Sequence, residues 1–359
     1  MSAIKKTKYE SFRYGTFAKG CRLCVTGEKS VLFVTGKCSQ NCYYCSLSDN
    51  KKNNENIIIN EWETKNFNDV LTEIKLCGSK GAGITGGDPL LVIDKTVSLI
   101  RLLKKNFGKK FHLHLYTPLK LVNEERLSKL YSAGLDEIRF HPDVDDTRFW
   151  ERINLAGKYN WDFGVEIPSL PHRMVETKKL IDYLSGKIQF MNINELELSD
   201  NNSQSFDGLD FKPKDQTSYA IKGSLKTAKS LADYAFSKGI KNVHFCTATL
   251  KDKYQLRQRI LRRAKNSKKD YDFMTKEGML IRGAIYYGNN EPKPIISWIK
   301  KEYGVPQSLL SIDSARNRIL TREDVAEKLK LPLKKKKLKV AIVEEYPTHD
   351  CFPIEVNYI

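Results

Sequence analysis

The chain lacks the features of a membrane-spanning, secreted or repetitive protein. No uninterrupted apolar stretch approaches the roughly 18 residues of a membrane helix, so we expect no spanning segment. The N-terminal residues MSAIKKTKYE lack the apolar core of a secretory signal, which predicts a cytoplasmic protein. Eight cysteines among 359 residues are too few for a disulfide scaffold. With 40% hydrophobic and 29% charged residues, the chain can bury a core, and global disorder is excluded.

The excess positive charge of +18 is concentrated in three segments. Residues 1–30 carry a net charge of +5, residues 251–269 carry +8 and residues 328–339 carry +7, so the rest of the chain is nearly neutral. One interpretation is an anionic partner such as RNA or another phosphorylated substrate. The other is a set of solvated, lysine-rich faces, because net charge also serves solubility. The composition leaves both open.

Apolar runs rich in β-branched residues alternate with segments of helical periodicity. In the first such segment, for example, Phe67, Val70, Leu71 and Ile74 follow i, i+3, i+4, i+7 spacing. Strand-helix alternation predicts βα units on a parallel sheet. Six or seven units fit an α/β fold with a partial (β/α)6–7 TIM-like barrel better than a doubly wound sheet, which periodicity does not exclude. The apolar runs lie at 31–34, 82–85, 111–116, 135–140, 163–167, 190–198 and 242–246.

The composition of the sequence differs at both ends of this region. After about residue 270 prolines become frequent, and short strand-like runs appear at 340–343 and 354–356. We therefore expect a barrel over 30–269, preceded by a basic, cysteine-containing extension over 1–29. Residues 270–359 are expected to form a small α+β domain with a candidate role in substrate recognition.

The most informative motif is VTGKCSQNCYYCSLS, which follows the first predicted strand. It places Cys38, Cys42 and Cys45 in C-x-x-x-C-x-x-C spacing at the carboxyl end of the sheet, where α/β active sites lie. Three thiolates can hold three irons of a [4Fe–4S] cluster and leave the fourth iron open to a small molecule. A zinc-stabilised RNA-binding protein without catalysis is the alternative, with Cys21 or Cys24 as a further ligand. A pure electron carrier is disfavoured, because such carriers usually close the cluster with four cysteines.

This loop, with the aromatic Tyr44 before its last cysteine, resembles the signature of the radical SAM superfamily. A second landmark, Gly86-Gly87-Asp88-Pro89, ends the second predicted strand and is similar to the family's GGEP motif, with Asp in place of Glu. The resemblance covers about residues 30–250. Within the superfamily, the sequence is most similar to an archaeal group of uncharacterised radical SAM proteins related to pyruvate formate-lyase activating enzymes.

The resemblance implies two cofactors, a [4Fe–4S] cluster on Cys38, Cys42 and Cys45 and S-adenosylmethionine bound to its open iron. The strand end at Gly86 and Gly87 would bind the amino group of S-adenosylmethionine, and we place Tyr44 and Asp88 at the same site. An electron from the reduced cluster would cleave the cofactor to a 5′-deoxyadenosyl radical, which abstracts hydrogen from an unidentified substrate. The family usually takes its electron from a ferredoxin or flavodoxin.

Polar residues on predicted strands extend the candidate site. Buried without partners they would cost about 1–3 kcal/mol each, so they pair with one another or line a cavity. We expect Glu166 and Asn194 to contact the ribose or amino acid part of the cofactor. His112 and His114 share one face of the third strand, and they either bind a ligand or form hydrogen bonds in the core. No residue is assigned as catalytic.

Two further groups have weaker signals. Cys21 and Cys24 form a single C-x-x-C, which is either half of a second metal site completed by Cys246 or Cys351, a redox pair, or a reduced structural pair. The basic stretch 251–259 predicts a helix with Lys251, Gln255 and Arg259 on one face, suited to an anionic group or simply to solvent.

Overall fold

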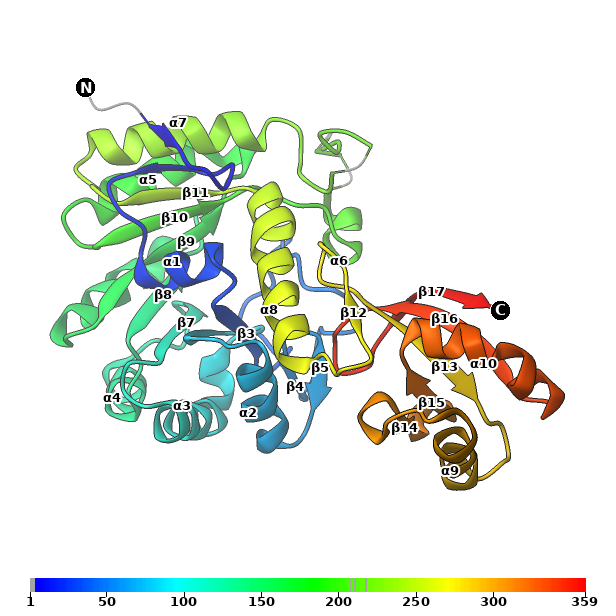
Figure 1. Cartoon of the computed structure of the whole chain (residues 1–359). Coiled ribbons are helices and arrows are strands. Elements are labelled where there is room, and N and C mark those ends of the chain that lie inside the picture. The colour runs from blue at the N-terminus through cyan, green and yellow to red at the C-terminus, as the bar shows by residue number, and fades with distance from the viewer. Residues whose placement is uncertain (1–3, 207, 210, 217) are drawn as a thin grey trace. The chain divides into compact units, whose positions relative to one another are not determined.

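The computed structural model describes residues 4–206, 208–209, 211–216 and 218–359. The chain divides into two compact units (Figure 1). The first comprises Met1–Lys75 and Ser79–Leu256, and the second comprises Leu76–Gly78 and Arg257–Ile359. None of the described helices is both long and apolar enough to cross a membrane.

The first unit is built on an open sheet whose central strands are parallel. Within the described residues the order is β1-β2-β11-β10-β9-β8-β7-β6-β3-β4-β5, and the strands from β3 to β11 along this path pair in parallel. The two ends of the sheet are occupied by antiparallel hairpins, so the sheet does not close. The predicted α/β fold with an open, barrel-like parallel sheet is therefore confirmed. The parallel strands are β3 (Lys29–Phe33), β6 (Gly81–Thr85), β7 (His112–Pro118), β8 (Glu137–His141), β9 (Asp162–Pro168), β10 (Phe190–Asn194) and β11 (Val243–Cys246); the hairpins are β1 (Lys5–Lys6) with β2 (Phe12–Tyr14) and β4 (Ile57–Ile59) with β5 (Trp62–Thr64).

Amphipathic helices cover the apolar face of this sheet. The helix α4, for example, begins after Asn123, whose side chain accepts a hydrogen bond from the Arg126 amide, and it ends at Gly134 in the left-handed region. Its apolar residues join the core with Leu113 and Leu115 of β7. The helices of this unit are α1 (Lys19–Val25), α2 (Phe67–Leu76), α3 (Ile93–Phe107), α4 (Glu124–Ala133), α5 (Met174–Leu184), α6 (Asp200–Ser203) and α7 (Ser224–Ser237), with shorter helical turns η1 (Pro89–Val92), η2 (Thr147–Lys158), η3 (Pro171–Arg173), η4 (Gln204–Phe206) and η5 (Leu250–Leu256).

The other face of the sheet is unusually polar. Because side chains alternate along a strand, His112, His114 and Tyr116 share this face of β7, opposite to the apolar residues. Small residues make room for them, since a Cβ on Gly83 would lie 2.6 Å from the His114 ring. The short helix α1 lies against this polar face, where the Gly20 amide donates to Glu137. We call the space enclosed by this face the lumen.

The second unit is a small α+β structure. Its described strands form an antiparallel sheet in the order β14-β15-β13-β16-β17, with β12 paired to β13. Buried Arg318 bridges Asp313 and Glu345, at 2.7 Å from each. The strand-like runs predicted at 340–343 and 354–356 lie in β16 and β17. The elements are α8 (Arg257–Ser267), β12 (Phe273–Met274), β13 (Leu280–Tyr286), α9 (Pro292–Tyr303), η6 (Gln307–Leu309), β14 (Ser311–Asp313), η7 (Ser314–Arg316), β15 (Arg318–Thr321), α10 (Glu323–Lys335), β16 (Lys339–Glu345) and β17 (Pro353–Tyr358).

Candidate radical site in the lumen

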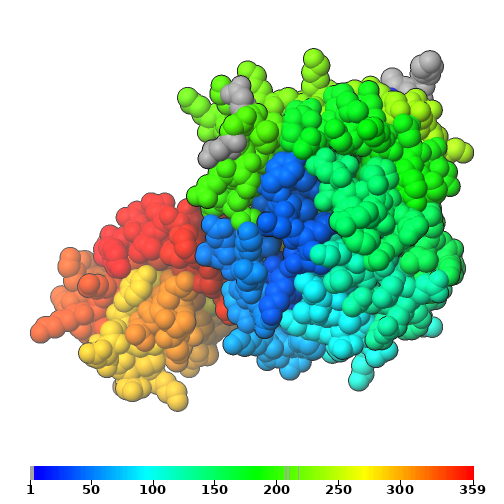
Figure 2. Space-filling view, turned by 180° about the vertical axis from the view of Figure 1, so that it is seen from behind, coloured from blue at the N-terminus to red at the C-terminus, as the bar shows by residue number. Residues whose placement is uncertain are grey.

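The three motif cysteines lie in the loop between β3 and β4, at the carboxyl end of the parallel strands. Cys38 is exposed, whereas Cys42 and Cys45 are partly buried. All three line one cavity of about 320 Å³, together with Gly86 and Gly87. In Figure 2 this loop is drawn in blue and forms part of the molecular surface beside the green segments of the chain. The structure therefore brings together the two motifs that the sequence singled out.

Gly86 and Gly87 are required by the close approach of the cysteine loop. A Cβ on Gly86 would lie 2.3 Å from the Thr35 carbonyl oxygen, and one on Gly87 would lie 2.1 Å from that of Lys37. The Gly87 amide donates to Thr35 at 2.7 Å. These contacts fix the start of the loop against the end of β6, with both glycines at the cavity wall.

Asp88 lies beneath the loop and does not line the cavity. Its side chain is fully buried and accepts hydrogen bonds from Ser39 Oγ at 2.7 Å, Thr117 Oγ1 at 2.9 Å and the Leu90 amide at 3.0 Å. Asp88 therefore ties the cysteine loop to β7 and to the start of η1. It holds the loop in place, whereas the sequence led us to expect a residue at the cofactor itself. Ser39 and Thr117 could not be identified from the sequence, because an isolated serine or threonine belongs to no recognisable motif.

Tyr44 lines the cavity and is held there by a chain of hydrogen bonds. Its hydroxyl lies 3.0 Å from His141 Nε2, and His141 Nδ1 lies 2.8 Å from the Glu166 carbonyl oxygen. A carbonyl only accepts, so Nδ1 carries the proton and Nε2 accepts from the Tyr44 hydroxyl. Burial raises the pKa of Tyr44 and lowers that of His141, so both are neutral at pH 7.

Glu166 is the centre of the polar lumen. Its carboxylate accepts from Arg139 Nη1 at 2.7 Å, Asn192 Nδ2 at 2.9 Å and Asn194 Nδ2 at 3.0 Å. Burial alone would raise the pKa of Glu166, but Arg139 and the two amides lower it to about 2. Glu166 and Asn194 both line the cavity of the cysteines. The structure thus places these two predicted residues at the cavity, in direct contact with each other.

A second cavity, of about 380 Å³, continues the lumen. Five residues line both cavities: Thr85, Tyr116, Glu166, Asn194 and Lys251. Cys21, Cys24 and Cys246 line the second cavity only, while Cys351 lies in the other compact unit. Buried Lys29, which the sequence analysis gave no role, also lines it. Lys29 lies two residues before the apolar run 31–34, so the sequence pattern did not mark it as part of the buried strand.

The predicted helix over 251–259 has a different geometry. Residues Leu250–Leu256 form a π-helical turn that continues into α8, so the stretch is helical as predicted but its first turn is wider than that of an α-helix. Lys251 and Gln255 line the second cavity, and Lys251 Nζ lies 2.7 Å from Glu197 Oε1. Arg259 belongs to α8 and is buried.

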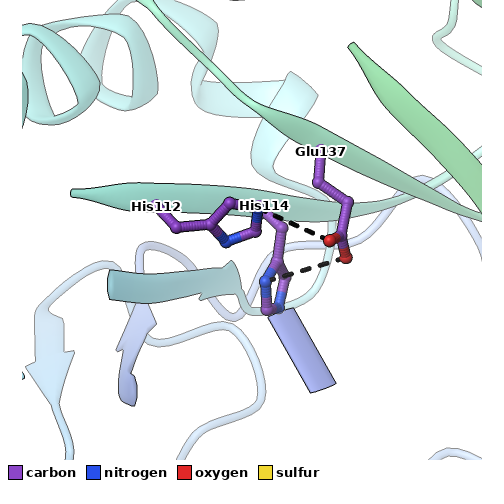
Figure 3. Close-up of side chains that lie close together, drawn as sticks. All are labelled: His112, His114 and Glu137. Atoms are coloured by element: carbon purple, nitrogen blue, oxygen red, sulfur yellow. Dashed lines mark ion pairs between the residues drawn. The ribbon is translucent and has the colours of Figure 1, made fainter. Parts of the chain in front are cut away.

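His112, His114 and Glu137 form a compact cluster with donor atoms within 4.8 Å of one another (Figure 3). Two basic side chains already bind the lone pairs that a metal ion would use. Lys29 Nζ lies 2.7 Å from His114 Nε2, and Arg139 Nε donates to Glu137 at 2.6 Å. A metal ion here would face both positive charges. For His114 these contacts favour the second interpretation, a buried polar network. Neither ring nitrogen of His112 has a hydrogen-bond partner among the described residues, and its Nε2 lies 3.5 Å from Glu137 Oε2.

Known protein families match both compact units of the chain. Residues 32–167 match the family described as the radical SAM superfamily, and residues 278–359 match a domain of unknown function, DUF8061. A protein of Methanocaldococcus jannaschii named "Putative glycyl-radical enzyme activating enzyme MJ0021" is 40% identical over 365 residues, which span 99% of this chain and 96% of that protein.

Two solved structures show weaker similarity. Methylornithine synthase is 14% identical, with a TM-score of 0.41 over 61% of this chain and 71% of its own. The radical S-adenosylmethionine methyltransferase TsrM from Kitasatospora setae is 12% identical, with a TM-score of 0.37 over 56% and 43%.

The superfamily implies a [4Fe–4S] cluster and S-adenosylmethionine, and the residues present fit both groups. Three thiols converge on one cavity, and two glycines expose strand-end backbone beside them. From its relative and its matched domain, this chain belongs to the radical SAM superfamily.

Proposed function

We propose that this chain is an enzyme that cleaves S-adenosylmethionine reductively at the cysteine loop and abstracts hydrogen from a substrate in the lumen. The observation that carries the proposal is the meeting of Cys38, Cys42 and Cys45 with Gly86 and Gly87 around one cavity. The cluster, when bound, supplies the electron that splits S-adenosylmethionine into methionine and a 5′-deoxyadenosyl radical. A ferredoxin or flavodoxin is the expected source of that electron.

The polar wall of the cavity suits the rest of the cofactor. A carboxylate has about four lone-pair sites, and three of those on Glu166 are already used by Arg139, Asn192 and Asn194. The remaining site can accept from a ribose hydroxyl. With its pKa lowered to about 2, Glu166 stays ionised as an acceptor across the physiological range.

Two substrate classes follow from different observations. The name of the relative favours a glycine residue of a partner enzyme as the hydrogen donor. The basic segments favour RNA, but Arg259 and Arg263 of the segment 251–269 are buried, so its outward charge is smaller than its composition indicates. We therefore place the protein glycine first and RNA second.

The test of the chemistry is formation of 5′-deoxyadenosine by anaerobically reconstituted protein with dithionite and S-adenosylmethionine. We expect product from the wild type and none from Cys42→Ala, whereas Cys77→Ala, a core cysteine outside both cavities, keeps activity. A colourless protein that binds zinc and leaves S-adenosylmethionine intact would refute the proposal. That result would favour the zinc-stabilised RNA-binding alternative.

The substrate classes separate by two readouts. A partner glycine predicts a carbon-centred radical on a second protein, seen by electron paramagnetic resonance after the reduced enzyme is mixed with protein fractions. RNA predicts binding that weakens steeply with salt, with a log–log slope set by the number of phosphate contacts. An RNA affinity that salt does not change would remove RNA from consideration.

A further inference from the structure

The second cavity collects cysteines that the radical chemistry does not use. Cys21 and Cys24 come from α1, whereas Cys246 is the last residue of β11, more than two hundred residues later. All three line the same cavity of about 380 Å³. Three of the eight cysteines of the chain therefore meet in one part of the lumen, separate from the three of the cysteine loop.

The residues that could bind a ligand here come in two pairs, and the two members of each pair lie on the same face of a helix or strand. Cys21 and Cys24 are three residues apart on a helix and so share a face. His244 and Cys246 are two residues apart on a strand and so share a face of the sheet. His244 also lines the second cavity. The fold thus joins a C-x-x-C from the N-terminal helix to an H-x-C from the last parallel strand, which gives a Cys₃His set of donors.

One ring nitrogen of His244 is free to bind a ligand. His244 is buried, and its Nδ1 has no hydrogen-bond partner among the described residues, while its Nε2 lies 3.2 Å from Ser11 Oγ. If Nε2–H donates to Ser11, Nδ1 presents a lone pair, as in metal-binding histidines whose other nitrogen is held by a second group. An unpartnered buried nitrogen costs free energy that a bound metal would recover.

The surroundings of Cys21 suit a sulfur that carries negative charge. Its Sγ accepts from Arg139 Nη2 at 3.4 Å and from Asn192 Nδ2 at 3.3 Å. Lys29 and Lys251 line the same cavity. N–H donors to sulfur and nearby cations are the features that stabilise thiolate-ligated clusters and tune their potentials.

The spacing of the donors favours a cluster over a single ion. Zinc–sulfur bonds of about 2.3 Å would bring tetrahedral ligand atoms within about 4 Å of one another. Among the described residues, the one such group within 4.8 Å is His112, His114 and Glu137, so neither set of three cysteines is gathered that tightly. A cluster spreads its ligands over several irons. Donors that are not gathered within 4.8 Å of one another are therefore compatible with a cluster and less so with a single zinc ion.

We propose that Cys21, Cys24, Cys246 and His244 bind a second iron–sulfur cluster in the lumen. Because five residues line both cavities, this cluster would border the S-adenosylmethionine site. The proposal concerns a separate set of ligands and does not depend on the proposed function. The remaining cysteines, Cys77 and Cys351, line neither cavity and provide matched controls.

The test counts iron and sulfide in full-length chains reconstituted anaerobically with both. One variant replaces Cys38, Cys42 and Cys45 by Ala, one replaces Cys21, Cys24 and Cys246, and the control replaces Cys77 and Cys351. We expect the wild type and the control to hold more than the four irons of one [4Fe–4S] cluster. The first variant should keep the excess and the second should hold four. Circular dichroism of each variant establishes that it is folded.

The role of His244 has its own readout. Replacing an imidazole ligand by a thiolate lowers the reduction potential of a cluster, as the contrast between Rieske and all-cysteine centres shows. We expect His244→Cys to keep the second cluster in the variant that lacks the first, with a lower midpoint potential in a redox titration. An unchanged potential would remove His244 from the ligand set.

Three results would overturn the second cluster. The first is a wild type with four irons that forms 5′-deoxyadenosine, while the Cys38, Cys42 and Cys45 variant holds none; the proposed function would then stand without the second site. The second is zinc without sulfide at the lumen cysteines. The third is excess iron that persists after Cys21, Cys24 and Cys246 are replaced. Failure of the proposed function itself would show separately, as absence of 5′-deoxyadenosine.

Discussion

Replacement of Glu166 by Gln tests whether the lumen is held together by one buried carboxylate. Glu166 is 15% exposed and pairs with Arg139, which is 2% exposed. The substitution keeps the size of the side chain and removes its charge. Arg139 retains Glu137, so the guanidinium is not left without an anion. The Gln amide also places an N–H group against one of the three donors to Glu166, so the pH dependence of the loss reports the charge of Glu166.

The magnitude follows from the pKa of the group. A carboxyl whose pKa falls from the ordinary 4.5 to about 2 on folding contributes about 3 kcal/mol at pH 7, at about 1.4 kcal/mol per pKa unit. Because the pKa is lowered in the folded state, this stabilisation is complete above pH 4.5 and is lost as the pH falls towards 2. The destabilisation by Glu166→Gln should therefore shrink from about 3 kcal/mol at pH 7 to about 1.5 kcal/mol at pH 3.

Urea unfolding of the metal-free chain at several pH values measures this difference, because acid would release iron from a cluster during the titration. Glu125→Gln is the matched control, since Glu125 forms an exposed pair with Lys129 on one helix face. We expect no measurable change from that substitution. A loss below about 1 kcal/mol for Glu166→Gln at pH 7, or a loss that does not vary with pH, would refute the reasoning.

Two further substitutions test how the lumen and the cysteine loop are built. Gly20→Ala would place a Cβ 2.4 Å from the His114 ring, so we expect destabilisation of about 1–3 kcal/mol in thermal unfolding. Gly157→Ala, whose nearest neighbour would be 3.9 Å away, should be tolerated, and equal effects of the two would contradict the packing argument. In Asp88→Asn the new side-chain N–H group would face one of the three hydrogen-bond donors to Asp88, which include Ser39. This loss of a hydrogen bond should lower the free energy of unfolding by about 1–3 kcal/mol. The variant should also release iron faster to a chelator, and an unchanged release rate would show that Asp88 does not hold the loop.

The predictable part of the fold came from local patterns. Each of the seven apolar runs contains or overlaps a parallel strand, because a strand buried on one face keeps its β-branched residues whatever it packs against. The π-helical turn at Leu250–Leu256 was not predictable, since it arises where the chain leaves β11 and passes the lumen. Lys251 and Gln255 still line one cavity, as the predicted shared face implies, whereas Arg259 is buried in α8 and lines neither cavity.

In the candidate site, too, residues that form a local motif could be predicted, whereas residues that act through contacts with distant segments could not. The cysteine loop and the Gly86-Gly87 strand end were readable because ligand spacing and close backbone approach are written into adjacent residues. The role of Asp88 was not, because two of its three donors, Ser39 and Thr117, come from other segments of the chain.

By itself, the sequence determined the strand-helix alternation, the cysteine motif proposed to hold the cluster, and the family. Only the tertiary structure decided which polar strand residues meet. Strand register sets Asn192 beside both Glu166 and His244, and this register depends on the whole sheet. It also decided that Cys21, Cys24 and Cys246 face one cavity, because contacts between residues more than two hundred positions apart leave no local pattern.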